Sequence, residues 1–307
     1  MNPLAPFEAR PRWSAVLGAL AIAFSGIFYR LSAVSPATAV FFRALYGLPL
    51  LLVVARAEDR RLGPMSRRAV GLSAAAGLCF AVDLMAFHYA VDAIGAGLAT
   101  VLANLQVVIV AVVAWLAFGE RPRREVVVAI PVMLAGVVLI SGVVGTGAYG
   151  ADPRAGVLLG LITATAYAGY LLIIRRASPD RRPGGPVAMS TAVTALFGLV
   201  FGLAVHDIDL VPSLPAHAYL LALGVLSQSI GYLAIQASLP RLPAVIASLL
   251  LFVQPATTLL LGTVLLGELP SPAQLVGVLL VIGGLAVATG SVRRIRAAVP
   301  SRRAGPA

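Results

Sequence analysis

Two amide side chains recur at equivalent places in a repeated stretch of the sequence. Gln106 lies in LQVVIVAVVAWLAFGERP, residues 105–122, and Gln254 lies in VQPATTLLLGTVLLGELP, residues 253–270. In each copy the Gln precedes a Glu by fourteen residues, and the copies are 148 residues apart. An amide offers donors and an acceptor without a fixed charge. The pair is therefore predicted to bind a polar or zwitterionic solute.

Other polar and aromatic residues accompany these amides. Asn104 lies two residues before Gln106, about 200° around a continuous helix, so the two are not expected to face one cavity squarely. Tyr167 and Tyr170 are three residues apart and share a helix face. The alternative is that the amides join helices and that the aromatics pack or form an interfacial belt. The predicted substrate-binding residues are Asn104, Gln106, Tyr167, Tyr170, Gln228 and Gln254.

Three aromatic residues near helix ends, Tyr89, Trp115 and Tyr232, are expected in the interfacial belt rather than at the solute. The belt is the usual place for aromatic rings at the ends of membrane helices, because one edge of the ring is apolar and the other is polar.

Two charged residues, Arg43 and Asp83, fall inside apolar runs. A charge in a membrane helix costs about 2.5–3.5 kcal/mol on insertion scales, so such a residue usually has a partner or a role. Both are expected about 9–10 Å below the same membrane surface, from a rise of 1.5 Å per residue. An Arg43–Asp83 ion pair is predicted, either as a packing contact or as a gate. His88 is the third candidate for gating or proton transfer.

Glu120 and Glu268 end the two copies of the repeated stretch. Each follows a helix end and precedes a Pro, and a carboxylate is favoured near a helix N-terminus. Both are therefore interpreted as structural residues at corners between helices. In the second copy Ser271 and Pro272 are expected to cap and start the next helix.

The composition excludes an ordinary soluble domain. Of 307 residues 60% are hydrophobic and 11% are charged, whereas soluble domains carry about 25% charged residues. The net charge of +11 lies in clusters between apolar runs and forms no basic face, so no nucleic-acid partner is expected. The mean hydropathy is +0.96.

About 20 apolar residues span a bilayer as a helix, because lipid cannot satisfy exposed backbone groups. The sequence predicts an all-α polytopic membrane protein with ten such helices, joined by short loops rich in Gly, Pro, Asp or Arg. The predicted spans are 13–29, 37–55, 69–89, 94–118, 125–142, 156–174, 187–205, 217–236, 243–266 and 273–291.

Arginines indicate the orientation. With both termini cytoplasmic, only Arg30 and Arg154 fall in outside segments, while most of the others fall in inside segments, as the positive-inside rule requires. Five helices lie on each side of the repeat boundary, so the copies must be antiparallel in the membrane. This predicts two inverted five-helix repeats, residues 1–148 and 149–307, an architecture typical of secondary transporters.

The residues also carry a family resemblance over essentially the whole chain. The stretches that carry it are SPATAVFFRALYGLPL (35–50), FHYAVDAIGAGLATVLANLQVVIVAVVAWLAFGE (87–120) and YLAIQASLPRLPAVIASLLLFVQPATTLLLGTVLLGE (232–268). Together with ten helices in two repeats, they resemble the drug/metabolite transporter superfamily, specifically the EamA-type exporters. The resemblance implies export of small metabolites, often amino acids, across the bacterial inner membrane.

The resulting prediction is a secondary exporter of amino acids or similar small polar metabolites that works by alternating access at a cavity between the repeats. Asp83 and His88 are the candidate proton carriers, and uniport is equally compatible. One alternative is an exporter of drugs or toxic cations, which would favour a carboxylate facing a cavity where only amides are expected. A second is a polytopic membrane enzyme or receptor.

No cofactor, metal or enzyme activity is predicted, because the three His residues are scattered and no HExxH, CxxC or phosphate-loop motif occurs. The expected partners are a small-molecule substrate and the lipid bilayer, with the chain acting as a monomer.

Overall fold

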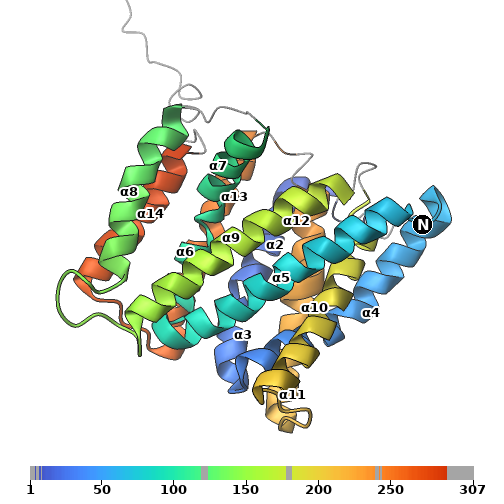
Figure 1. Ribbon diagram of the computed structural model, residues 1–307, viewed down its shortest axis with the longest axis horizontal. Coiled ribbons are helices and arrows are strands. Elements are labelled where there is room, and N and C mark those ends of the chain that lie inside the picture. Colours follow the sequence, from blue (N-terminus) through green and yellow to red (C-terminus); the bar gives the residue numbers. More distant parts are fainter. Residues whose placement is uncertain are drawn as a thin grey trace, which may run out of the picture.

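The structure is a computed structural model that describes residues 4, 7, 9–118, 124–177, 182–238, 242 and 244–288. Within these ranges the chain is helical and has no β-strand (Figure 1). The helices are α2 (Pro11–Ala23), α3 (Ser25–Ser32), α4 (Pro36–Leu62), α5 (Arg67–Ile94), α6 (Ala96–Ala103), α7 (Gln106–Phe118), α8 (Arg124–Ile140), α9 (Pro153–Ala177), α10 (Gly184–Val205), α11 (Leu214–Ala222), the π-helix η1 (Leu223–Gly231), α12 (Tyr232–Ser238), α13 (Ala244–Leu266) and α14 (Pro272–Ala288).

Serine followed by proline starts two of these helices. Ser35 caps α4 by accepting a hydrogen bond from the backbone of Thr38, and Pro36 is the first residue of that helix. Ser271 Oγ accepts from Gln274 N at 3.3 Å, and Gln274 Oε1 accepts from Ser271 N at 3.0 Å. This reciprocal capping box confirms the predicted start of the last helix.

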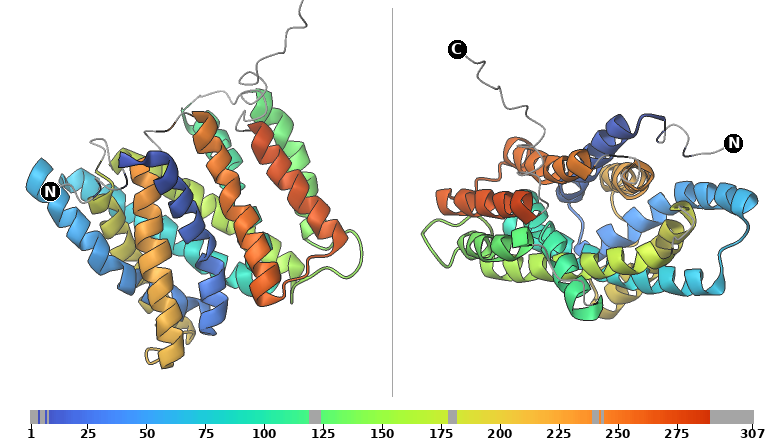
Figure 2. Two further views of the ribbon diagram at one scale, coloured as in Figure 1. Left: turned by 180° about the vertical axis from the view of Figure 1, so that it is seen from behind. Right: turned by 90° about the horizontal axis from the view of Figure 1, so that it is seen from above.

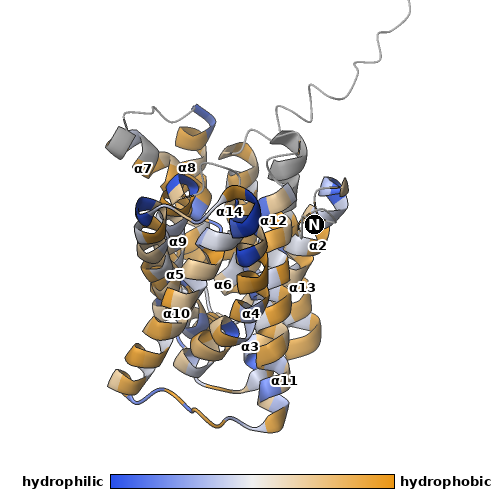
Figure 3. Ribbon diagram, turned by 90° about the vertical axis from the view of Figure 1, so that its right-hand side faces the viewer, coloured by the Kyte–Doolittle hydropathy of each residue, from blue (hydrophilic) through white to orange (hydrophobic). Residues whose placement is uncertain are grey.

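The helices are apolar along most of their length (Figure 3). Seven in the described part are long and apolar enough to cross a membrane, and the apolar helices Val253–Leu266 and Pro272–Ala288 are shorter. The chain is therefore a multi-pass membrane protein, and ten crossings stay a prediction. The seven are Pro11–Ser32, Pro36–Leu62, Arg67–Ile94, Ala96–Val113, Pro153–Ala177, Gly184–Val205 and Leu214–Ser238.

Several predicted spans are not uniform α-helices. The predicted span 94–118 is interrupted between α6 and α7, at Asn104 and Leu105. The predicted span 217–236 contains the π-helix η1, whose wider turns often occur at functional sites. In α13, by contrast, Pro255 lies inside a continuous helix. These irregular segments determine which side chains reach the interior.

Three helix pairs form much of the bundle. α5 lies along α9, α4 along α10, and α8 along α14, the last pair standing at one edge of the molecule (Figures 1 and 2). At the α8–α14 crossing, a Cβ added to Gly136 would lie 2.6 Å from the Gly277 carbonyl oxygen. Glycine is required there because the backbones approach too closely for any side chain.

Candidate functional site

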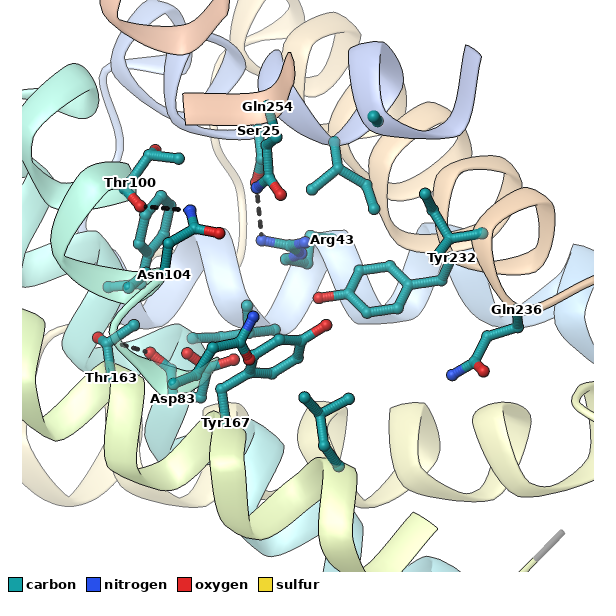
Figure 4. Close-up of a pocket in the computed structure, with 18 residues that line it drawn as sticks. Ser25, Arg43, Asp83, Thr100, Asn104, Thr163, Tyr167, Tyr232, Gln236 and Gln254 are labelled. Carbon is teal, nitrogen blue, oxygen red and sulfur yellow. Dashed lines mark hydrogen bonds between the residues drawn. The ribbon is translucent and has the colours of Figure 1, made fainter. Parts of the chain in front are cut away.

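A cavity of about 220 Å³ lies inside the bundle, lined by residues of α2 to α7, α9, α12 and α13. Its wall combines apolar side chains with charged, amide and hydroxyl groups (Figure 4). Six of the predicted binding or gating residues line it, namely Arg43, Asp83, Asn104, Gln106, Tyr167 and Gln254.

The break after α6 brings Asn104 and Gln106 to the same cavity. Asn104 N donates to Thr100 O and Val101 O, and Asn104 Nδ2 donates to Thr100 O at 2.8 Å. The turn at Asn104 and Leu105 changes the rotation between the two segments. Both side chains line the cavity, although on one continuous helix they were not expected to face it squarely.

Arg43 enters the cavity from α4 and is 1% exposed. Its Nε donates to Gln228 Oε1 at 3.0 Å, and its Nη1 donates to Ser25 Oγ at 3.1 Å. No salt bridge within 4.0 Å joins Arg43 to Asp83. The predicted ion pair is therefore wrong as a direct contact, because two neutral oxygens hold the guanidinium instead.

Asp83 faces the same cavity from α5 and is 5% exposed (Figure 4). Its backbone oxygen accepts a hydrogen bond from Thr163 Oγ1 at 3.3 Å, whereas its carboxylate takes part in no hydrogen bond or salt bridge with the rest of the described chain. The cavity thus contains a carboxylate where the sequence led us to expect only amides.

Gln228 does not line the cavity. It lies fully buried in η1, where Oε1 accepts from Arg43 Nε and Nε2 donates to Thr191 Oγ1 at 3.1 Å. Ser229, the next residue, donates to the carbonyl oxygens of Gly47 and Gly224 and ties the π-helix to α4. Gln228 thus contacts Arg43 and not the cavity itself, and its predicted role at the substrate stays a prediction.

The two tyrosines predicted on one face of α9 have different environments. Tyr170 is fully buried and stacks on Phe80, so it is absent from the cavity wall, whereas Tyr167 lines the cavity. Tyr232, which we expected in the interfacial belt, also lines the cavity, because η1 and α12 direct it inward. Gln236 on α12 also lines the cavity, although it is not among the residues predicted from the sequence.

His88 lies outside the cavity wall as well. It is fully buried and stacks on the ring of Tyr29, with centroids 4.3 Å apart. Tyr29 in turn donates a hydrogen bond to Asp92 at 2.6 Å. Of the two candidate proton carriers, only Asp83 is placed where a solute in the cavity could touch it.

Glu268 is 2% exposed and binds a helix N-terminus far away in the sequence. Its Oε1 accepts from Ala96 N at 2.6 Å, and its Oε2 accepts from Gly97 N at 3.0 Å. A carboxylate at a helix N-terminus was expected, but the helix is α6 and not the one that follows Glu268. The corresponding Glu120 lies outside the described residues.

No group of three or more His, Cys, Asp or Glu side chains able to hold a metal ion occurs in the described part of the chain.

An all-helical, multi-pass fold around a polar cavity is the architecture of a membrane transporter. The EamA-like transporter family matches this chain over residues 12–142 and again over residues 154–290. The chain belongs to this family, which confirms the resemblance to the drug/metabolite transporter superfamily. Membership indicates a transporter rather than an enzyme.

Two relatives and one solved structure are similar to this chain. The chain is 29% identical to the uncharacterized transporter YwfM of Bacillus subtilis over 227 residues, 73% of this chain and 74% of that protein. It is 30% identical to the uncharacterized protein PA1977 of Pseudomonas aeruginosa over 276 residues, 89% and 92% of the two chains. A crystal structure with 21% identity and a TM-score of 0.61, covering 95% of this chain and 99% of that chain, is similar in fold alone.

Proposed function

We propose that the protein is a secondary transporter that exports amino acids or similar small polar metabolites across the bacterial inner membrane by alternating access. The observation that carries the proposal is the cavity beside the break between α6 and α7, whose largely apolar wall includes charged and amide side chains. Interrupted membrane helices typically form the substrate sites of such transporters, because the helix ends offer backbone groups to a solute. The cavity takes residues from both predicted repeats, 1–148 and 149–307.

A pair of equivalent contacts supports the inverted arrangement of ten helices. At the start of α4, Ala37 N donates to Asp207 Oδ2 at 3.3 Å, and at the start of α10, Gly185 N donates to Glu58 Oε2 at 3.0 Å. Ala37 and Gly185 are 148 residues apart, which is the offset of the sequence repeat. Each predicted repeat therefore supplies a carboxylate to the same helix start in the other, which favours a two-fold relation between them, although Glu58 and Asp207 are 149 residues apart and not 148.

The size of the cavity favours metabolites over drugs. Pockets for drug-sized ligands measure about 300–1,000 Å³, and this cavity measures about 220 Å³. A carboxylate in the cavity was the feature expected of a cation exporter. Asp83 provides one, but the same cavity also presents the positive charge of Arg43, which disfavours a ligand that carries only a positive charge.

Transport by the purified protein in proteoliposomes tests the proposal. We expect uptake or counterflow of one or more members of a radiolabelled amino-acid panel, and no transport of a lipophilic cation. Movement of the cation together with no movement of any amino acid would establish the alternative function. Repeating the assay with and without a pH gradient separates proton coupling from uniport.

A further inference from the structure

We propose that Arg43 and Asp83 bind the two opposite charges of one zwitterionic substrate, Arg43 its carboxylate and Asp83 its ammonium group. This inference rests on the proposed function and narrows its substrate class to α-amino acids with an apolar side chain. It replaces the idea that the two residues pair with each other.

The geometry leaves Arg43 ready to bind an anion. A guanidinium has five N–H donors, and two of them are used by Gln228 and Ser25. Both acceptors are neutral, so the hydrogen bonds fix the orientation of the side chain without offsetting its positive charge. The three remaining donors suit the two oxygens of a carboxylate, which an arginine can bind in a bidentate manner.

The side of the cavity around Asp83 suits a cation. The Asp83 carboxylate has no hydrogen-bond partner in the described part of the chain. Asn104 lies on the same side of the cavity (Figure 4), and because its Nδ2 is bound to Thr100 O, its Oδ1 is left as an acceptor.

A zwitterion provides a counter-charge for Arg43 and for Asp83 at the same time. Buried charges are destabilising unless they are paired and hydrogen-bonded, and here Arg43 and Asp83 are buried but not joined to each other. A cation would leave Arg43 without a counter-charge, and an anion would leave Asp83 without one. Only a ligand with both charges gives each residue an opposite charge. The site therefore selects against singly charged ligands, because each of them leaves one buried charge unpaired.

The apolar part of the wall defines the rest of the substrate. Ile22, Leu171 and Ile235 line the cavity and offer no hydrogen-bonding groups from their side chains. A side chain of similar chemistry, such as that of leucine, fits this wall better than a charged one, because a further charge would be buried without a partner.

Binding of three related probes to the purified protein in detergent tests the assignment. Leucine carries both charges, 3-methylbutylamine lacks the carboxylate, and 4-methylpentanoate lacks the ammonium group. By calorimetry we expect leucine to bind about tenfold or more tightly than either analogue, the effect of leaving one charge-assisted hydrogen bond unmade. Equal binding of leucine and one analogue would overturn the proposal.

Two substitutions give opposite expected patterns. Asp83→Asn should weaken leucine and 3-methylbutylamine by about tenfold or more, and 4-methylpentanoate should bind as tightly as before or more tightly, because the unpaired carboxylate is gone. Arg43→Gln should weaken leucine and 4-methylpentanoate, and 3-methylbutylamine should bind as tightly as before or more tightly. A variant that merely misfolds would lose all three probes alike, and that result in both variants, or no change in selectivity, would refute the assignment.

A third substitution tests the positioning role of Gln228. Gln228→Ala removes the acceptor that orients Arg43, so it should reproduce the Arg43→Gln pattern in weaker form. Ser227→Ala is the matched control, because this neighbour in η1 is equally buried but donates to Ala21 O at 2.6 Å and not to Arg43. Equal effects of the two substitutions would show that Gln228 acts on the fold alone.

The outcomes also separate this inference from the broader proposal. If amino acids are transported but the analogues bind as tightly as leucine, the zwitterion site is refuted and the proposed exporter function stands. If only a lipophilic cation is transported, the zwitterion site and the proposed export of amino acids are both refuted.

Discussion

Replacing Glu268 with alanine removes both side-chain acceptors from the start of α6. The carboxylate is 2% exposed, and its hydrogen bonds to Ala96 N and Gly97 N measure 2.6 and 3.0 Å. A hydrogen bond to a charged group contributes about 1.5–3 kcal/mol. Loss of two such bonds in a buried place should lower the free energy of unfolding by about 3–6 kcal/mol.

The measurement is thermal unfolding of purified protein in detergent, followed by intrinsic fluorescence. With a shift of about 2–4 °C per kcal/mol for a chain of 150–250 residues, Glu268→Ala should lower the midpoint by roughly 10 °C. Glu268→Gln keeps one acceptor oxygen and should have about half the effect. Gly262→Ala should also weaken the hydrogen bonds of Glu268 to α6, since its Cβ would lie 2.3 Å from Glu268 Oε2.

Asp209→Ala is the matched control. The Asp209 carboxylate also accepts a backbone hydrogen bond, from Val211 N at 2.9 Å, but it does so in an exposed loop. Its loss should cost less than about 1 kcal/mol. If Glu268→Ala shifts the midpoint no more than Asp209→Ala does, the two hydrogen bonds of Glu268 to α6 do not stabilise the protein, and the prediction is refuted.

Three further predictions use the same unfolding measurement. Glu58→Ala removes both acceptors from the start of α10, where Gly184 N donates at 2.9 Å, and should cost at least about 2 kcal/mol; a loss below 1 kcal/mol would contradict it. Gly136→Val places a side chain against the Gly277 carbonyl and forces α8 away from α14, which should lower the free energy of unfolding by about 1–3 kcal/mol. An unchanged midpoint would show that the two helices can adjust to the added side chain. Ser271→Ala removes an N-cap and should cost about 1 kcal/mol, with Ser271→Thr as the conservative variant that retains stability.

Local signals predicted the helices well, because apolar length and capping residues act over a few neighbours. The start of α14 at Ser271 and Pro272 is an example, because Ser271 caps the helix as predicted. The interruption at Asn104 and Leu105 contains neither proline nor glycine, so no local signal in the sequence predicted it. Pro255, which does carry such a signal, lies in a continuous helix.

The site residues were harder to predict, because their partners are distant in sequence. Gln228 contacts Arg43 across 185 residues, and no spacing rule relates them. The rise per residue predicted Arg43 and Asp83 at the same depth in the membrane, and both line one cavity. Equal depth does not show, however, whether the two side chains touch. That depends on which neutral groups compete for the arginine, which only the three-dimensional arrangement shows.

The carboxylates at the helix starts make the two halves of the chain mutually dependent. Residues 1–148 contain the starts of α4 and α6 but neither Asp207 nor Glu268, and residues 149–307 contain the start of α10 but not Glu58. Either half alone would leave these N–H groups without their carboxylate acceptors. Expressed as two separate polypeptides in one cell, the halves should therefore rescue each other, as two subunits of a heterodimer do.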